Sequence, residues 1–159
     1  MSSQSLIFSA GMGAVASARS MTPMATIAAA RLAGRDVPGH LIFLDRPWFK
    51  YGALAMGIGE LLGDKMKTAP DRTVLLGLLA RLMSAAVAGA ALAPRARPQA
   101  GAVIAIATAL PLAYLTLAAR KHAMARVGQT RSGLIEDALI VSLGVAIVVL
   151  ATRSKPRQP

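Results

Sequence analysis

Long apolar segments constrain this chain more than any other feature of its sequence. Residues 73–93, 100–119 and 133–151 each approach the length of about 20 apolar residues that crosses a bilayer core as a helix. A fourth apolar stretch, 6–34, is longer still and holds only two charged residues. Mean hydropathy is +0.54, and charged residues make up 16% of the chain against about 25% in soluble domains. We therefore predict an all-α fold, a polytopic membrane helical bundle.

The N-terminal apolar stretch is interrupted at Arg19-Ser-Met-Thr-Pro23. Pro23 lacks a backbone donor and disfavours helical geometry at Thr22, so we expect two half-helices, about 6–19 and 23–33. The flank before residue 6 carries no positive side chain, and the apolar character continues past any plausible cleavage site, which argues against a signal peptide. The first span is therefore expected to be one helix that is broken near the middle of the membrane.

The run 47–63 is short for a membrane span and is less regular than the others. Gly59 and Gly63 stand at the GxxxG spacing that lets helices approach closely, and Glu60 lies near the end of the run. Two interpretations stay open, a marginal span or a helix packed inside the bundle. The aromatic residues around the start of this run are typical of a membrane-surface belt: Trp48, Phe49 and Tyr51.

These segments give one membrane-embedded domain over residues 1–151, followed by a disordered basic tail at 152–159. The bundle has four to five hydrophobic segments, at about 6–33, 47–63, 73–93, 100–119 and 133–151. Pro111 is expected to kink its segment. Lys and Arg divide almost evenly between the two sides if all segments cross, so the positive-inside rule fixes no orientation.

The interruption at residues 19–23 is the sharpest candidate for a binding site. Thr22 followed by Pro23 is a preferred helix start, with Thr22 as N-cap and Pro23 as the first helical residue. Such a start exposes amide groups that attract anions, and Arg19 and Ser20 add a guanidinium and a hydroxyl. Helix starts inside the membrane recur in transporter substrate sites. The alternative is structural, a proline kink whose Arg19 pairs with a buried carboxylate.

Carboxylates within the apolar segments need partners. Glu60 and Asp64 are four residues apart and share a face if their helix continues. Arg19 and Arg81 are the cations available to them, and we expect a network of charges that lines the bundle. In the functional interpretation these carboxylates handle protons or cations, and in the structural one they only balance the arginines.

Glu136 and Asp137 open the last apolar segment. In the functional interpretation they belong to the same network. In the structural one they form a first-turn pair that the helix dipole favours at the interface, with Ser132 as the cap.

Arg81 interrupts an apolar helix about eight residues after its start, which is too deep for a terminal anchor without snorkelling. We expect its side chain to face protein or water. Small residues follow it and form a surface on which helices pack closely or a second copy docks. These residues are Ser84, Ala85, Ala88, Gly89 and Ala93.

The remaining pattern argues against an enzyme. The chain has no cysteine, its two histidines lie in separate segments, and the phosphate-loop, zinc-protease and serine-hydrolase motifs are all missing. We therefore predict no catalytic residue, no metal and no cofactor. The net charge of +11 comes largely from basic stretches that we expect to be loops, among them 120–132 with Arg120. In so apolar a chain, these stretches suit anionic lipid headgroups better than nucleic acid.

Five pieces of the sequence, spread over residues 10–145, together resemble the bacterial membrane family catalogued as domain of unknown function 4126. They are Ala18-Arg-Ser-Met-Thr-Pro-Met24, Glu60-Leu-Leu-Gly-Asp-Lys65, Thr68-Ala-Pro-Asp-Arg-Thr73, Arg81 with its small residues, and Glu136-Asp137. The resemblance implies a small multi-pass protein of the bacterial inner (plasma) membrane. It implies no activity.

Three function classes follow from these residues, and the third, an enzyme that binds a metal–diphosphate lipid substrate, is discounted because only Glu60 and Asp64 approximate the Asp-rich signature of such enzymes. The first is a channel or transporter for a small ion or polar solute, with an anion favoured, which would act as a homo-oligomer because so few spans make a small transport path. The second is a non-catalytic accessory or scaffold subunit of a larger membrane complex. Transport predicts that Arg19, Glu60 and Arg81 converge on one hydrated cavity, whereas a scaffold predicts dry, fully paired bridges.

Overall fold

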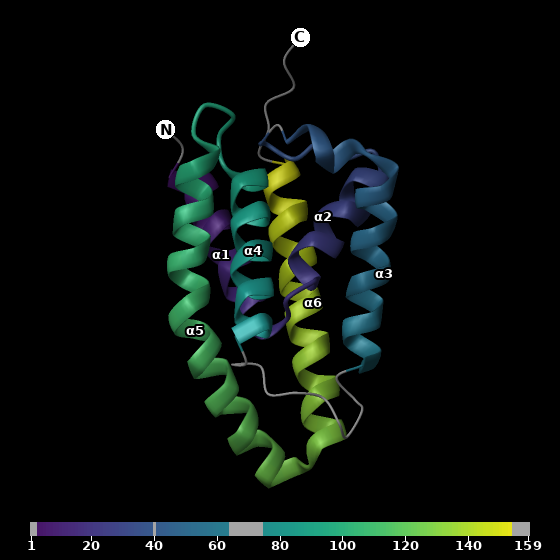
Figure 1. Ribbon diagram of the computed structural model, residues 1–159, viewed down its shortest axis with the longest axis vertical. Helices are drawn as coiled ribbons and strands as arrows, with labels where there is room; N and C mark the ends of the chain where they lie inside the picture. Colours follow the sequence, from purple (N-terminus) through teal and green to yellow (C-terminus); the bar gives the residue numbers. More distant parts are fainter. Residues whose placement is uncertain (1–2, 40, 64–74, 154–159) are drawn as a thin grey trace.

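The computed structural model describes residues 3–39, 41–63 and 75–153, and every regular element in those ranges is a helix (Figure 1). The elements are α1 (Ser3–Ala18), α2 (Thr22–Leu32), the 3-10 turn η1 (Ile42–Asp45), α3 (Pro47–Gly63), α4 (Leu75–Leu92), α5 (Pro98–Val127) and α6 (Gln129–Arg153). Three helical stretches are long and apolar enough to cross a membrane: Leu75–Leu92, Pro98–Arg126 and Thr130–Arg153. The chain is therefore a small integral membrane protein with an all-α fold.

Contacts along α6 give the direction of α1. Gly11 lies against Ile147 near the C-terminal end of α6, and Arg19, just after α1, forms an ion pair with Asp137 near the other end. Because α1 moves towards the start of α6 as its own numbering rises, the two helices are antiparallel.

Contacts with α6 also show that α2 runs in the opposite direction to α1. Thr26 lies against Gly144, and the Arg35 guanidinium donates a hydrogen bond of 3.4 Å to Thr152 Oγ1 near the end of α6. The two half-helices therefore run towards and then away from the start of α6, and Figure 1 shows them meeting within the bundle.

The pair α1–α2 is thus re-entrant. The half-helices were predicted correctly, but the interpretation of 6–33 as one broken span is wrong, because the chain reverses at residues 19–21 instead of continuing. Helices of 16 and 11 residues are about 24 and 16 Å long, and neither reaches across a core of about 30 Å. Pro23 thus starts a returning helix instead of kinking a continuous one.

The last two helices are longer than their apolar segments. The basic stretch 120–132, expected as a loop, is helical on both sides of Gly128, whose φ of 84° ends α5. Alanine, methionine, lysine and arginine dominate residues 118–126, and these are good helix formers, so charge marks the edge of the apolar region without ending the helix. Figure 1 shows the hairpin of α5 and α6 reaching beyond the ends of the other helices. Pro111 lies inside α5, which bends partway along its length in this view.

Small residues bring α4 and α5 into backbone contact. A Cβ added to Gly89 would overlap the carbonyl oxygen of Gly101, and one added to Gly101 would overlap that of Gly89. The Ser9 hydroxyl of α1 also donates to Gly89 O at 2.9 Å. Ala85 is buried with residues of α1 and α5, and Ala88 with residues of α1, α2 and α6, so the small-residue surface of α4 is filled within the chain and a second copy cannot dock on it.

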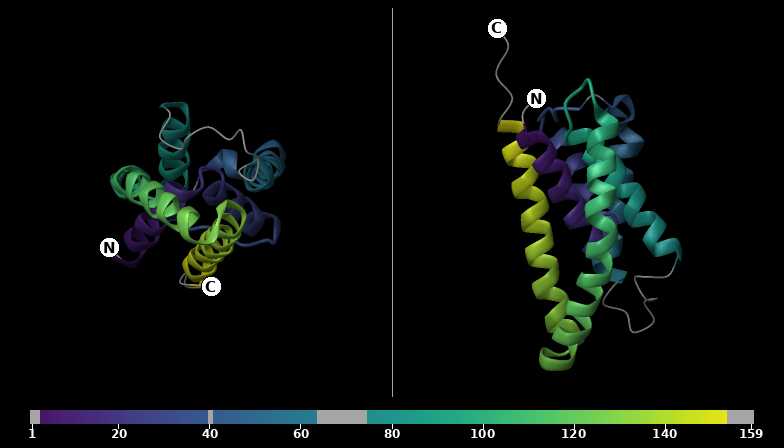
Figure 2. Two further views of the ribbon diagram at one scale, coloured as in Figure 1. Left: turned by 90° about the horizontal axis from the view of Figure 1, so that it is seen from below. Right: turned by 90° about the vertical axis from the view of Figure 1, so that its left-hand side faces the viewer.

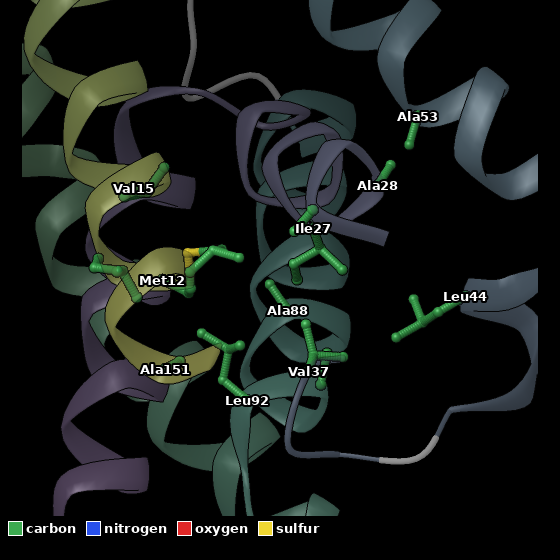
Figure 3. Packing of buried hydrophobic residues seen from close by; sticks show 14 of the residues in the cluster. Met12, Val15, Ile27, Ala28, Val37, Leu44, Ala53, Ala88, Leu92 and Ala151 are labelled. Carbon is green, nitrogen blue, oxygen red and sulfur yellow. The ribbon is translucent and has the colours of Figure 1, made fainter. Parts of the chain in front are cut away.

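The apolar core lies between α1, α2, α4 and α6. Figure 3 shows Met12, Ile27, Leu92 and Ala151 from these four helices in one cluster, and all four are at most 2% exposed. The end-on view in Figure 2 shows α3 at the edge of the bundle beside α2. Gly57 of α3 faces Ala25, whereas Gly59 and Gly63 face open space, so Gly57 makes the close helix approach that was predicted for the GxxxG pair.

Candidate functional site

The re-entrant turn, residues 19–21, joins the two half-helices and carries the first predicted site residues. The last hydrogen bond of α1 runs from Arg19 N to Val15 O, and the first of α2 from Ala25 N to Met21 O. The amides of Ser20 and Met21 therefore lie between two helical ladders. Inside a membrane such amides need partners from the protein, because lipid offers none.

Glu60 of α3 supplies those partners. Its Oε1 accepts hydrogen bonds from Ser20 N at 2.7 Å and Ser20 Oγ at 2.6 Å, and its Oε2 accepts one from Met21 N at 2.8 Å. Thr22 was predicted as the N-cap, but Met21 holds that position and makes no side-chain cap, so this prediction is wrong by one residue. The carboxylate from a neighbouring helix does the capping instead.

Arg19 and Asp137 form a buried ion pair between the re-entrant turn and α6. The Arg19 side chain is 2% exposed and that of Asp137 is 13% exposed. Arg19 was expected to pair with a buried carboxylate, and the structure identifies that carboxylate as Asp137. Arg19 therefore forms the predicted structural pair at the same turn that was predicted to bind an anion.

Glu136, the neighbour of Asp137, points to a different helix. Its Oε2 accepts a hydrogen bond of 3.0 Å from the Arg120 guanidinium of α5, and the two side chains are 17% and 9% exposed. The first-turn interpretation of these acids is wrong, because α6 begins at Gln129 and Ser132 lies inside it, buried and not at its cap. Arg120 was not predicted as a site residue, although it is the first charge after a long uncharged run in α5.

Arg81 lies at a similar level of the bundle. From the contact between Ser9 and Gly89, antiparallel helices with a rise of 1.5 Å per residue place Arg81 within about 3 Å of the level of Arg19. Its Nη1 donates to Gly77 O of its own helix at 3.1 Å, and the residue is 6% exposed. Asp64 lies outside the described residues.

The depth of this charged level follows from α5. Residues 98–119 hold no charge and span about 33 Å, close to the thickness of the hydrocarbon core, so Arg120 marks one membrane boundary. Thr116, one turn deeper, donates a hydrogen bond of 3.4 Å to Ser17 O at the end of α1. The re-entrant turn therefore lies near the boundary marked by Arg120, past the middle of the membrane as counted from the side where α1 begins, and not at the mid-membrane position predicted from the sequence.

A cleft of about 280 Å³ opens beside the turn, between α5 and α6. Its polar lining comes from Arg120 and Glu136 and from the hydroxyls of Thr116 and Ser132. Its apolar lining residues are Ala18, Ala119, Ala123, Ile135, Leu139 and Ile140. Arg19, Glu60 and Arg81 do not line it, so this cleft is not the shared cavity that the transport interpretation predicted for them.

Within the described residues, no three His, Cys, Asp or Glu side chains are grouped so that they could hold a metal ion. Comparison of the chain with family models, with curated proteins and with solved structures found no match. The candidate site therefore stands on its geometry: a buried ion pair, a partly buried one, a carboxylate bound to backbone amides, and an amphiphilic cleft, all near one membrane boundary.

Proposed function

We propose that this protein conducts or transports a small anion, and that the re-entrant turn is the place where the anion binds. One observation carries the proposal, the carboxylate of Glu60 bound to two backbone amides and a hydroxyl of residues 20–21. These donors select a negatively charged group with oxygen or halide acceptors. The Glu60 carboxylate, which α3 carries, occupies the position that a free anion would take at these donors.

In this proposal, transport exchanges one anion for another at the same donors. A free anion takes the hydrogen bonds of Ser20 and Met21 when the Glu60 side chain rotates away, and Glu60 returns when the anion leaves. The exchange requires a change of rotamer at Glu60, whose side chain is only partly buried on a helix at the edge of the bundle. The donors stay fixed by α1 and α2, so the site keeps its shape during the exchange.

Arg19 and Asp137 adjust the field at these donors. A lone guanidinium beside the turn would hold an anion too tightly for release, and a conduction site needs binding that is favourable but reversible. Pairing Arg19 with Asp137 leaves a dipole at the turn in place of a full positive charge. The paired Arg19 guanidinium therefore attracts an anion less strongly than an unpaired guanidinium would.

Flux in liposomes tests the proposal. The purified protein is reconstituted and compared for chloride, phosphate, potassium and proton flux, with Glu60→Gln and Arg19→Gln as variants. We expect an anion-selective flux that Arg19→Gln abolishes and Glu60→Gln alters in rate. Asp36→Asn, which removes a partner of Arg31 on the exposed surface, is the matched control and should conduct like the parent. Equal flux in all variants would exclude the turn as the site.

A second candidate function is a non-catalytic accessory or scaffold subunit of a membrane complex. The observation that favours it is the pairing of Arg19 with Asp137 and of Arg120 with Glu136, each across two elements of the bundle. Such pairs fix helix register whether or not an ion passes. A folded protein without flux of any tested species, and with partners that co-purify from the native membrane, would support this role and contradict transport.

The resemblance to the bacterial family supports the bacterial inner membrane as the location under either proposal. Only the transport proposal includes a homo-oligomer, which would complete the path for the anion. Its contact must use a face other than the small-residue face of α4, which the chain fills itself.

A further inference from the structure

The cleft between α5 and α6 plays no part in the proposed anion exchange, although it lies at the membrane boundary. It runs from the level of Thr116 and Ile140 to the level of Ala123 and Ser132, which is about 11 Å along the helices. Arg120 crosses it to Glu136 at the level where the uncharged run of α5 ends. One end of the cleft thus lies at the depth of lipid tails, and the other at the depth of headgroups.

The lining of the cleft changes along this direction. Its deep end is walled by Ala18, Leu139 and Ile140, and the Thr116 hydroxyl there donates to carbonyl oxygens of the protein. A small charged solute would lose its hydration at that end without gaining partners. A hydrocarbon chain suits the deep end, so the ligand that fits is an amphiphile.

The charge around the outer end selects the headgroup. Arg126 and Arg131, which we call the basic tip, are exposed on the hairpin beyond the cleft. The sequence holds no Asp or Glu between Asp71 and Glu136, so neither α4 nor α5 brings a carboxylate to the basic tip. Each basic side chain near a membrane surface favours anionic lipid about fivefold, which corresponds to about 1 kcal/mol.

We propose that this cleft binds an anionic phospholipid, with part of one acyl chain between α5 and α6 and the phosphate facing the basic tip. Arg120, 9% exposed and held by Glu136, marks the level at which chain gives way to headgroup. Bound lipid would fill the space between the two helices where they reach past the rest of the bundle, and so fix their spacing. This binding is independent of anion transport at the re-entrant turn.

Native mass spectrometry of the detergent-purified protein tests the proposal. The protein is titrated with phosphatidylglycerol and, separately, with phosphatidylcholine of the same acyl chains. We expect phosphatidylglycerol to bind at least about tenfold more tightly, because it carries the net negative charge that phosphatidylcholine lacks and each of the two arginines of the basic tip favours that charge. The double variant Arg126→Gln with Arg131→Gln should lower phosphatidylglycerol binding to the level of phosphatidylcholine. Equal binding of the two lipids to the parent protein would overturn the proposal.

A matched pair of alanine variants tests the place of the acyl chain. Ala123 lines the cleft, whereas Ala125, two residues on in the same helix, is exposed and does not line it. Leucine is a good helix former at both positions, so the variants differ mainly in whether they fill the cleft. We expect Ala123→Leu to weaken phosphatidylglycerol binding about tenfold, because each displaced methylene contributes to chain burial, and Ala125→Leu to leave it unchanged.

Circular dichroism and thermal unfolding in the same detergent confirm that both alanine variants fold. Should Ala123→Leu fail to fold, Ala119→Leu replaces it, since Ala119 lines the same cleft. Unchanged binding in a folded cleft variant would place the lipid elsewhere and contradict the proposal.

Discussion

The two ends of α1 are held in the bundle by different chemistry. Near its start, Ser9 and the glycines of α4 and α5 bring three helices into backbone contact without any charge. Just past its end, Arg19 pairs with Asp137, and Glu60 binds the amides of the re-entrant turn. The difference follows from what the backbone does at each end: helices that continue need only close packing, but a chain that reverses inside a membrane must also satisfy its free amides.

The largest effect should come from separating the buried ion pair. Arg19→Met leaves the Asp137 carboxylate without its partner in a site where it is 13% exposed, and we expect a loss of about 3 to 5 kcal/mol in the free energy of unfolding. Denaturant unfolding in detergent micelles measures it. The double variant Arg19→Met with Asp137→Leu should recover part of the loss, because no uncompensated charge remains. A loss below about 1 kcal/mol in the single variant would mean that the pair does not hold the turn.

The uncharged end of α1 gives the next effect. Gly89→Ala places a methyl group against the backbone of α5, and we expect about 1 to 3 kcal/mol of destabilisation from overpacking. Gly59→Ala is the matched control, because a Cβ there meets nothing within 4 Å, and it should stabilise its helix by up to about 1 kcal/mol. Thermal unfolding compares the two, and the same sign of change in both would contradict the close contact of α4 with α5.

Glu60→Gln sharpens the distinction between charge and hydrogen bonding at the turn. Glutamine keeps one oxygen for the turn but puts an NH2 where the other oxygen accepts from Met21 N. We expect about 1 to 2 kcal/mol of destabilisation from the lost charge-assisted bonds. Hydrogen exchange of the Ser20 and Met21 amides should rise in the variant. Unchanged protection of both amides would show that another group satisfies them.

The smallest effect should come from Asp36, an exposed carboxylate that follows α2. Arg31 donates to Asp36 at 2.8 Å, but the Asp36 side chain is 68% exposed. Asp36→Asn should change the unfolding free energy by about 0.5 kcal/mol or less, since water and salt screen such pairs. An effect as large as that of Arg19→Met would erase the contrast between buried and exposed pairs.

The sequence predicted the helices better than their paths. Apolar length identified the three spanning helices, and Pro23 identified the break, because both are local properties of the chain. The reversal at residues 19–21 was not predictable in this way. Its stability depends on Glu60 reaching it from 39 or 40 residues further along the chain, and no local pattern shows such a contact.

The candidate site, too, was predicted in its residues but not in their contacts. Arg19, Glu60 and Asp137 were identified because charges in apolar segments are costly and so stand out in a sequence. The partner of each residue was not identified. The pair of Arg19 with Asp137, for example, depends on α1 running antiparallel to α6. Arg120 was missed because it was assigned to a loop, and the helix that carries it continues to Val127.

The re-entrant turn is the central claim, and cysteine labelling tests it most directly. The chain has no native cysteine, so Gln4→Cys, Arg35→Cys and His122→Cys each give a single exposed thiol at the start of α1, after α2 and near the hairpin tip of α5 and α6. Each variant in sealed proteoliposomes is treated with a membrane-impermeant maleimide, before and after lysis. We predict that Gln4→Cys and Arg35→Cys are labelled from outside in equal fractions and His122→Cys in the complementary fraction. Complementary labelling of Gln4→Cys and Arg35→Cys would show that residues 6–33 cross the membrane once and would contradict the re-entrant turn.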